Sequence, residues 1–255
     1  MLIAGFAYSL PSTAASTSKP YKAETVDECI QEKECVWWIF KKLFLQDAQH
    51  ATKDDVLMRW ERPVDIRVMD GDKYLNELHS VIADLQPQFP HKIYINGNGA
   101  NVFFLFGENI EKAYLKHHRF FESILRNRMV FIDAMLSPNI STSNCGSVYL
   151  NNSKKEIIGG LLLSTISSKT RVNCINFNAY KILTANGIWA LPSALDENFK
   201  DPEAHMTKLD HFILRLFNSP LLTTGMPLAE IEGRFNNVYV HELNNFYESS
   251  GENSK

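Results

Sequence analysis

Hydrophobic residues recur along this chain at two spacings, one typical of helices and the other of strands. The segment 26–47 starts with charged residues and continues into a dense apolar stretch, which predicts a helix with a broad buried stripe. In segment 59–69 apolar and polar residues alternate, which predicts a half-buried strand. Helical spacing then follows over 74–85 and ends at Pro87. Both kinds of element therefore occur in the first third of the chain.

The remaining pattern adds further strands and helices. Short strands are predicted at 93–95 and 102–106, and the Asn-Gly-Asn-Gly run at 96–99 between them predicts a hairpin turn. A nearly continuous apolar run at 157–167 predicts a strand that is buried on both faces. Pro227 is expected to begin a last short helix. The other predicted helices span 111–127, 176–186 and 208–218.

Composition and charge describe an ordinary globular protein. The chain has 255 residues, 26 Lys and Arg against 29 Asp and Glu, and a formal net charge of −3. This length fits one large domain or two smaller ones. A near-neutral balance gives no positive field for nucleic-acid phosphates or anionic lipid, so we expect no nucleic-acid partner. No run of apolar residues is long enough to cross a bilayer, so no transmembrane segment is expected.

The first residues resemble an export signal. Residues 1–10 are mostly apolar and are followed by Pro11 and several small residues, although the usual basic start is missing. We therefore expect segment 1–20 to be a signal or a disordered segment. This favours a periplasmic or secreted protein, with a cytoplasmic location as the alternative.

Four cysteines are too few for a disulfide scaffold, but an even number allows pairing. If Cys29 and Cys35 lie in one helix, they are about 9 Å apart along its axis, too far for a bridge. Cys145 and Cys174 lie at the edges of two predicted elements and could pair with each other. The alternative is four buried, reduced thiols.

No sequence motif of a common enzyme is present. The chain lacks the His-Glu-x-x-His pattern of helical zinc sites, the Gly-x-Ser-x-Gly elbow of hydrolases and the phosphate-binding loop. His205 and His211 are six residues apart with Asp210 between them, and solvent-facing or capping roles suit them better than a metal. The sequence therefore predicts no metal site and no cofactor.

Several segments together resemble a known bacterial family. They are the segment 59–68, the strand Ala-Asn-Val-Phe-Phe-Leu-Phe at 100–106, Cys145, Cys174 and the closing stretch LDHFILRLFNSPLLTTGMPLAE at 209–230. They resemble the bacterial exported domain-of-unknown-function 2927 family over about residues 57–234. The resemblance implies an α+β fold, zincin-like, with a small mixed sheet and packed helices. It divides the chain into an N-terminal helix at 21–56, the zincin-like domain at 57–235 and a C-terminal extension at 236–255.

The resemblance also implies a degenerate metal motif. Aligned on Gly187, Tyr180 and Thr184 stand where a zincin has its two histidines, and Lys181 stands where it has its catalytic glutamate. Tyrosine and threonine are poor zinc ligands, and a protonated lysine repels the ion. Tyr180, Lys181 and Thr184 are then the expected polar lining of any groove that remains.

These features favour a non-catalytic binding or assembly-associated protein on a degenerate metallopeptidase-like scaffold, with an unidentified protein partner. The alternative is a hydrolase acting on peptides or cell-wall material through a non-standard site, for which Asp196, Asp201 and His205 are the candidates. A purely structural domain without a groove is a third interpretation. Fold resemblance does not decide among them, because function depends on the site.

Overall fold

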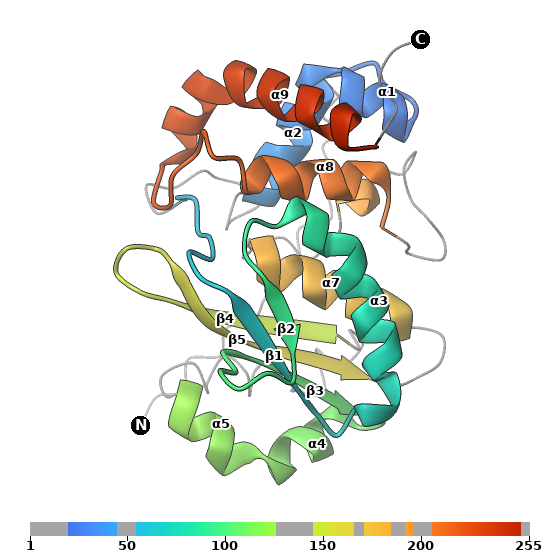
Figure 1. Cartoon of the computed structure of the whole chain (residues 1–255), viewed down its shortest axis with the longest axis vertical. Coiled ribbons are helices and arrows are strands. Elements are labelled where there is room, and N and C mark those ends of the chain that lie inside the picture. The colour runs from blue at the N-terminus through green and yellow to red at the C-terminus, as the bar shows by residue number, and fades with distance from the viewer. Residues whose placement is uncertain are drawn as a thin grey trace, which may run out of the picture.

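The protein is described by a computed structural model that covers residues 20–44, 55–125, 145–165, 171–184, 192–195 and 206–250. One five-stranded sheet lies at the centre, helices lie over both of its faces, and a separate layer of helices lies beyond one of them (Figure 1). The predicted small mixed sheet with packed helices is confirmed. None of the described helices is both long enough and apolar enough to cross a membrane.

Four of the five strands run parallel. The strands are β1 (Val64–Met69), β2 (Ile93–Ile95), β3 (Val102–Gly107), β4 (Cys145–Asn151) and β5 (Ile157–Thr165), arranged in the order β2-β1-β3-β5-β4. Only β4, at one edge, pairs antiparallel with its neighbour β5. β5 contributes Leu162 to the core on one face of the sheet and Leu161 and Leu163 to the core on the other, which explains its nearly continuous apolar run and confirms the prediction that both of its faces are buried. β4 was not predicted from the sequence.

The Asn-Gly-Asn-Gly run does not form the predicted hairpin. β2 and β3 lie on opposite sides of β1, and both run parallel to it, so segment 96–101 crosses β1. The buried carboxylate of Asp65, in β1, holds this crossing by accepting hydrogen bonds from the backbone N–H groups of Gly97 at 2.9 Å and Gly99 at 2.7 Å. A Cβ at position 97 would come within 2.6 Å of that carboxylate, so a glycine is required there. The glycines thus allow a close crossing instead of a two-strand turn.

Two pairs of helices cover the sheet. α3 (Leu75–Leu85) and α7 (Arg171–Thr184) pack on one face, over a core that includes Val102, Phe104 and Leu162. On the opposite face, α4 (Ile110–Lys116) and α5 (His118–Leu125) place Tyr114 and Phe121 over apolar residues of β3 and β5. The predicted helix 111–127 is therefore two helices that meet at His117.

A second core lies in the helical layer, which is built from both ends of the chain. Its helices are α1 (Val26–Gln31), α2 (Lys33–Phe44), α8 (Lys208–Phe217) and α9 (Leu228–Ser250). Phe40 of α2 stacks on Phe217 of α8 with ring centroids 4.4 Å apart. α9 has 23 residues and is not the short helix expected after Pro227. It also runs without a break across positions 235 and 236, where the C-terminal extension was expected to begin. The helix predicted at 208–218 is confirmed as α8.

The predicted single helix 26–47 is interrupted, and this changes the cysteine pairing. Glu32 is in an extended conformation between α1 and α2, and its carboxylate accepts hydrogen bonds from the backbone N–H groups of Lys22 and Ala23. The break brings the Cα atoms of Cys29 and Cys35 to 5.3 Å, and the two form a disulfide. The expectation that they cannot pair was wrong, because it assumed a continuous helix.

Cys174, which is buried in α7, is also disulfide-bonded. The side chain of Cys145 lies outside the described residues, so the Cys145–Cys174 bridge stays a prediction.

Candidate functional site

The three residues expected in a degenerate metal motif lie together on α7. One side of this helix packs against the sheet, in the core that contains Ile175, Ala179 and Ile182. The end of α7 is held in place by Trp60, whose indole N–H donates a hydrogen bond to the carbonyl of Ile182 at 2.9 Å. That carbonyl is one of the last four of the helix, which have no partner within it. The motif positions are therefore on a firmly packed helix.

All three motif side chains are buried. Tyr180 is 2% exposed, Lys181 6% and Thr184 4%. The Thr184 hydroxyl donates to the carbonyl oxygens of Tyr180 at 3.1 Å and Lys181 at 3.4 Å, which satisfies it within its own helix. Neither of the two concave surfaces found on the described residues is lined by these three side chains. Their role as a groove lining stays a prediction.

Burial changes the acid–base properties of two of these groups. It lowers the pKa of Lys181 from 10.5 to about 7, because an ammonium ion is poorly solvated inside the protein. Burial, together with the negative charge of Asp210, raises the pKa of Tyr180 well above its ordinary value. The Tyr180 hydroxyl stays protonated, and no group of the described residues forms a hydrogen bond with it. Neither residue type at these positions fits a zinc ion.

Asp210, close to Tyr180, has a structural role. Its carboxylate accepts hydrogen bonds from the backbone N–H and the hydroxyl of Ser193 and from the same two groups of Thr207. Burial raises the pKa of Asp210, and these four hydrogen bonds oppose that effect. Asp210 thus caps the start of α8 and ties the short segment 192–195 to it.

The sequence candidates for hydrolysis are not brought together in the part of the chain that can be described. Asp196, Asp201 and His205 lie outside the described residues. His211, which is described, pairs with α3, since its Nε2 lies 3.1 Å from a carboxylate oxygen of Asp84. Over the described ranges, no three His, Cys, Asp or Glu side chains are grouped so that they could hold a metal ion.

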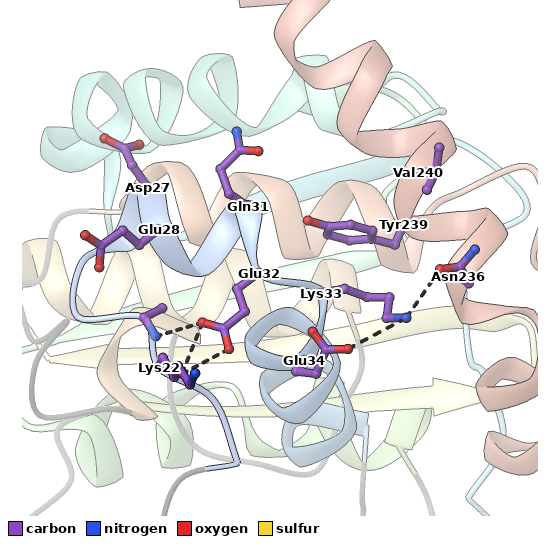
Figure 2. Close-up of a pocket in the computed structure, with 11 residues that line it drawn as sticks. Lys22, Asp27, Glu28, Gln31, Glu32, Lys33, Glu34, Asn236, Tyr239 and Val240 are labelled. Atoms are coloured by element: carbon purple, nitrogen blue, oxygen red, sulfur yellow. Dashed lines mark hydrogen bonds and ion pairs between the residues drawn. The ribbon is translucent and has the colours of Figure 1, made fainter.

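Two concave surfaces of the described residues lie between helices. The smaller one encloses about 490 Å³ between α3 and α7, with Glu77, Asp84 and Asn176 among its lining residues. The larger one is a wide, open depression of about 870 Å³ between α1, the start of α2, and α9 (Figure 2). We call this larger surface the α1–α9 groove. The sequence does not reveal this surface, because its two walls are about 200 residues apart in the chain and neither carries a motif.

Comparison with known proteins identifies no relative. No protein-family model matches the chain, and neither a curated protein nor a solved structure is significantly similar to it.

Proposed function

We propose that this protein is an exported, non-catalytic binding or assembly-associated protein, built on a zincin-like scaffold whose metal motif has degenerated. The burial of Tyr180, Lys181 and Thr184 is the observation that carries this proposal. In a zinc peptidase the corresponding side chains must reach a metal ion and a substrate. Here they are packed inside the protein, and none of them is a residue type that suits zinc.

The architecture supports the scaffold part of the proposal. α7 follows β5 in the chain and packs against β4 and β5, so the motif positions lie on a helix that covers a small mixed sheet. The resemblance noted in the sequence implies this kind of arrangement.

The Cys29–Cys35 disulfide supports the export part. Disulfides form and persist in oxidising compartments such as the periplasm or the extracellular space, and they are rare in the cytosol. Both cysteines of this pair are fully buried, which is typical of a structural bridge. The proposal therefore places the protein where such a bridge is maintained.

Metal content and hydrolysis, measured on the same sample, test the proposal. The full chain, purified from the periplasm without chelator, should contain far less than one zinc per molecule by elemental analysis. It should also hydrolyse neither labelled casein nor peptidoglycan, with or without added zinc, while a zinc peptidase serves as positive control. Stoichiometric zinc together with chelator-sensitive hydrolysis would overturn the proposal and favour the hydrolase alternative.

A further inference from the structure

The Asn-Gly-Asn-Gly run at 96–99 contains two asparagines that are each followed by glycine. An Asn-Gly step deamidates readily in an unfolded chain, because glycine has no side chain to hinder the reaction. The backbone nitrogen of the glycine forms a bond to Cγ of the asparagine, and the bond from Cγ to the side-chain nitrogen breaks. That nitrogen takes up the proton of the backbone N–H and leaves as ammonia. Water then opens the cyclic imide to aspartate or isoaspartate.

In this fold one carboxylate holds both of the glycine N–H groups that would have to react. The N–H of Gly97 donates to Asp65 Oδ1 at 2.9 Å, and the N–H of Gly99 donates to Oδ2 at 2.7 Å. Asp65 is 6% exposed and belongs to β1, which is paired with β2 on one side and with β3 on the other. The acceptor is therefore fixed, and it does not follow segment 96–99 when that segment moves.

These hydrogen bonds oppose the reaction in two ways. In the imide, Cγ of the asparagine replaces the hydrogen on the glycine nitrogen, so a carbon atom would lie on the line to a carboxylate oxygen only 2.7 or 2.9 Å away. The attacking nitrogen must also lose its proton, and the negative charge that develops on it is repelled by the carboxylate. Deamidation therefore requires that segment 96–99 first leaves Asp65, which takes these partners from a buried group.

The two asparagines are not held equally. Asn96 Oδ1 accepts a hydrogen bond from the backbone N–H of Val68 at 2.9 Å, and the backbone N–H of Asn96 donates to the carbonyl of Ile66 at 2.7 Å. Both partners belong to β1. Asn98 is exposed, and its side chain forms no hydrogen bond with the described residues. Reaction at Asn98 therefore needs fewer hydrogen bonds to break than reaction at Asn96.

We propose that Asp65 protects both Asn-Gly steps from spontaneous deamidation, and that Asn98 is the first of the two to be modified in the folded protein. The glycines that allow the close crossing of β1 also make the segment chemically sensitive, and the carboxylate they approach offsets that sensitivity. Conversion of Asn98 adds a negative charge to the segment that Asp65 binds, and isoaspartate also lengthens its backbone. The modified segment should therefore be held less firmly.

Peptide mapping by tandem mass spectrometry, on the full chain aged at neutral pH either folded or in urea, tests the inference. In urea, Asn96, Asn98 and Asn186, which is also followed by glycine, should deamidate at similar rates. In the folded chain Asn98 should react at least about tenfold more slowly than in urea, because a hydrogen bond to a charged group must break first. Asn96 should react more slowly still. Equal rates in the folded chain and in urea, or faster reaction at Asn96 than at Asn98, would overturn the inference.

Two variants separate these hydrogen bonds from stability in general. Asp65→Ala removes both acceptors, and it should speed deamidation of the folded chain at both asparagines by about tenfold. Leu216→Ala removes a fully buried side chain from the core of the helical layer, so it lowers stability without touching the crossing. It should leave both rates unchanged, and equal acceleration in the two variants would overturn the inference.

Circular dichroism shows whether each variant is folded. If Asp65→Ala does not fold, Asp65→Asn takes its place. The asparagine keeps one acceptor oxygen, so at least one of the two steps should become faster, and unchanged rates at both would contradict the role of the carboxylate.

Discussion

Replacing Lys181 with methionine should remove a buried charge and change how stability depends on pH. Lys181 is 6% exposed, and its burial in α7 lowers its pKa from 10.5 to about 7. The unfolded chain exposes the amine to water, so its pKa there stays near 10.4. Because the unfolded state holds this proton more tightly than the folded state, protonation of Lys181 destabilises the fold. The destabilisation is complete below pH 7 and disappears as the pH rises towards 10.4.

The pKa difference sets the size of the effect. At about 1.4 kcal/mol for each pH unit, it corresponds to about 5 kcal/mol, reached well below pH 7. Between pH 7 and pH 9 the folded state loses the proton while the unfolded state keeps it. Deprotonation of Lys181 in the folded state should therefore raise the free energy of unfolding of the wild type by about 2 kcal/mol from pH 7 to pH 9. Methionine has a similar length and no charge, so Lys181→Met should be more stable at pH 7 and should lack this rise.

Urea unfolding at pH 7, 8 and 9 measures the effect. The difference in the free energy of unfolding between the wild type and Lys181→Met isolates residue 181 from other titrating groups. That difference should shrink by about 2 kcal/mol from pH 7 to pH 9. Lys112→Met, at an exposed position of α4, is the control and should run parallel to the wild type. Parallel curves for the wild type and Lys181→Met would refute the reasoning, because they would show that Lys181 titrates alike in both states.

Three further changes test other parts of the structure. Asp65→Asn replaces one carboxylate oxygen with an amide NH₂ group, which cannot accept the backbone N–H bonds of segment 96–101. It should lower the free energy of unfolding in urea by about 2–3 kcal/mol, whereas Asn98→Ala, at an exposed position of the same segment, should have little effect. The double change of Cys29 and Cys35 to alanine, which adds no polar group at these fully buried positions, should cost about 2 kcal/mol or more relative to the oxidised wild type and clearly less relative to the reduced wild type, as measured by urea unfolding. The pKa of Asp70 is lowered, chiefly by the hydrogen bond that its carboxylate accepts from Lys116, so the ionised carboxylate stabilises the fold. Asp70→Asn should therefore have a lower free energy of unfolding than the wild type at pH 6, and this difference should disappear as the pH falls below about 4. A difference that stays constant with pH would contradict this.

Periodicity located most of the sheet, because alternation and continuous apolar runs follow directly from which faces of a strand are buried. The predictions of a strand within 59–69 and of a doubly buried strand over 157–167 correspond in this way to β1 at 64–69 and β5 at 157–165. α8 was also located within one residue, since a polar start and Pro220 bound its apolar pattern. A sequence pattern therefore predicts an element correctly where residues within the element and next to it determine its structure.

Features that depend on contacts between distant segments were missed. The crossing at 96–101 looks like a hairpin, because Asn-Gly runs favour tight turns and the sequence does not show that Asp65 is its partner. The break at Glu32 is invisible in a segment of good helix formers, since it depends on the backbone of Lys22 and Ala23. The α1–α9 groove could not be foreseen for the same reason, because its walls meet only in the folded chain.

The helical layer joins the beginning and the end of the chain, and this has a consequence for the order of folding during synthesis. α1 and α2 are made first, yet the apolar residues that cover them lie in α8 and α9, which are made last. The sheet needs only residues 64–165 for its strands, so its pairing can begin while the ribosome is still adding the last quarter. The first helices must keep their apolar side chains out of aggregates through nearly the whole of translation. The Cys29–Cys35 bridge joins residues only six apart, so in an oxidising compartment it can form before α8 and α9 have packed, and it can hold the α1–α2 bend until they do.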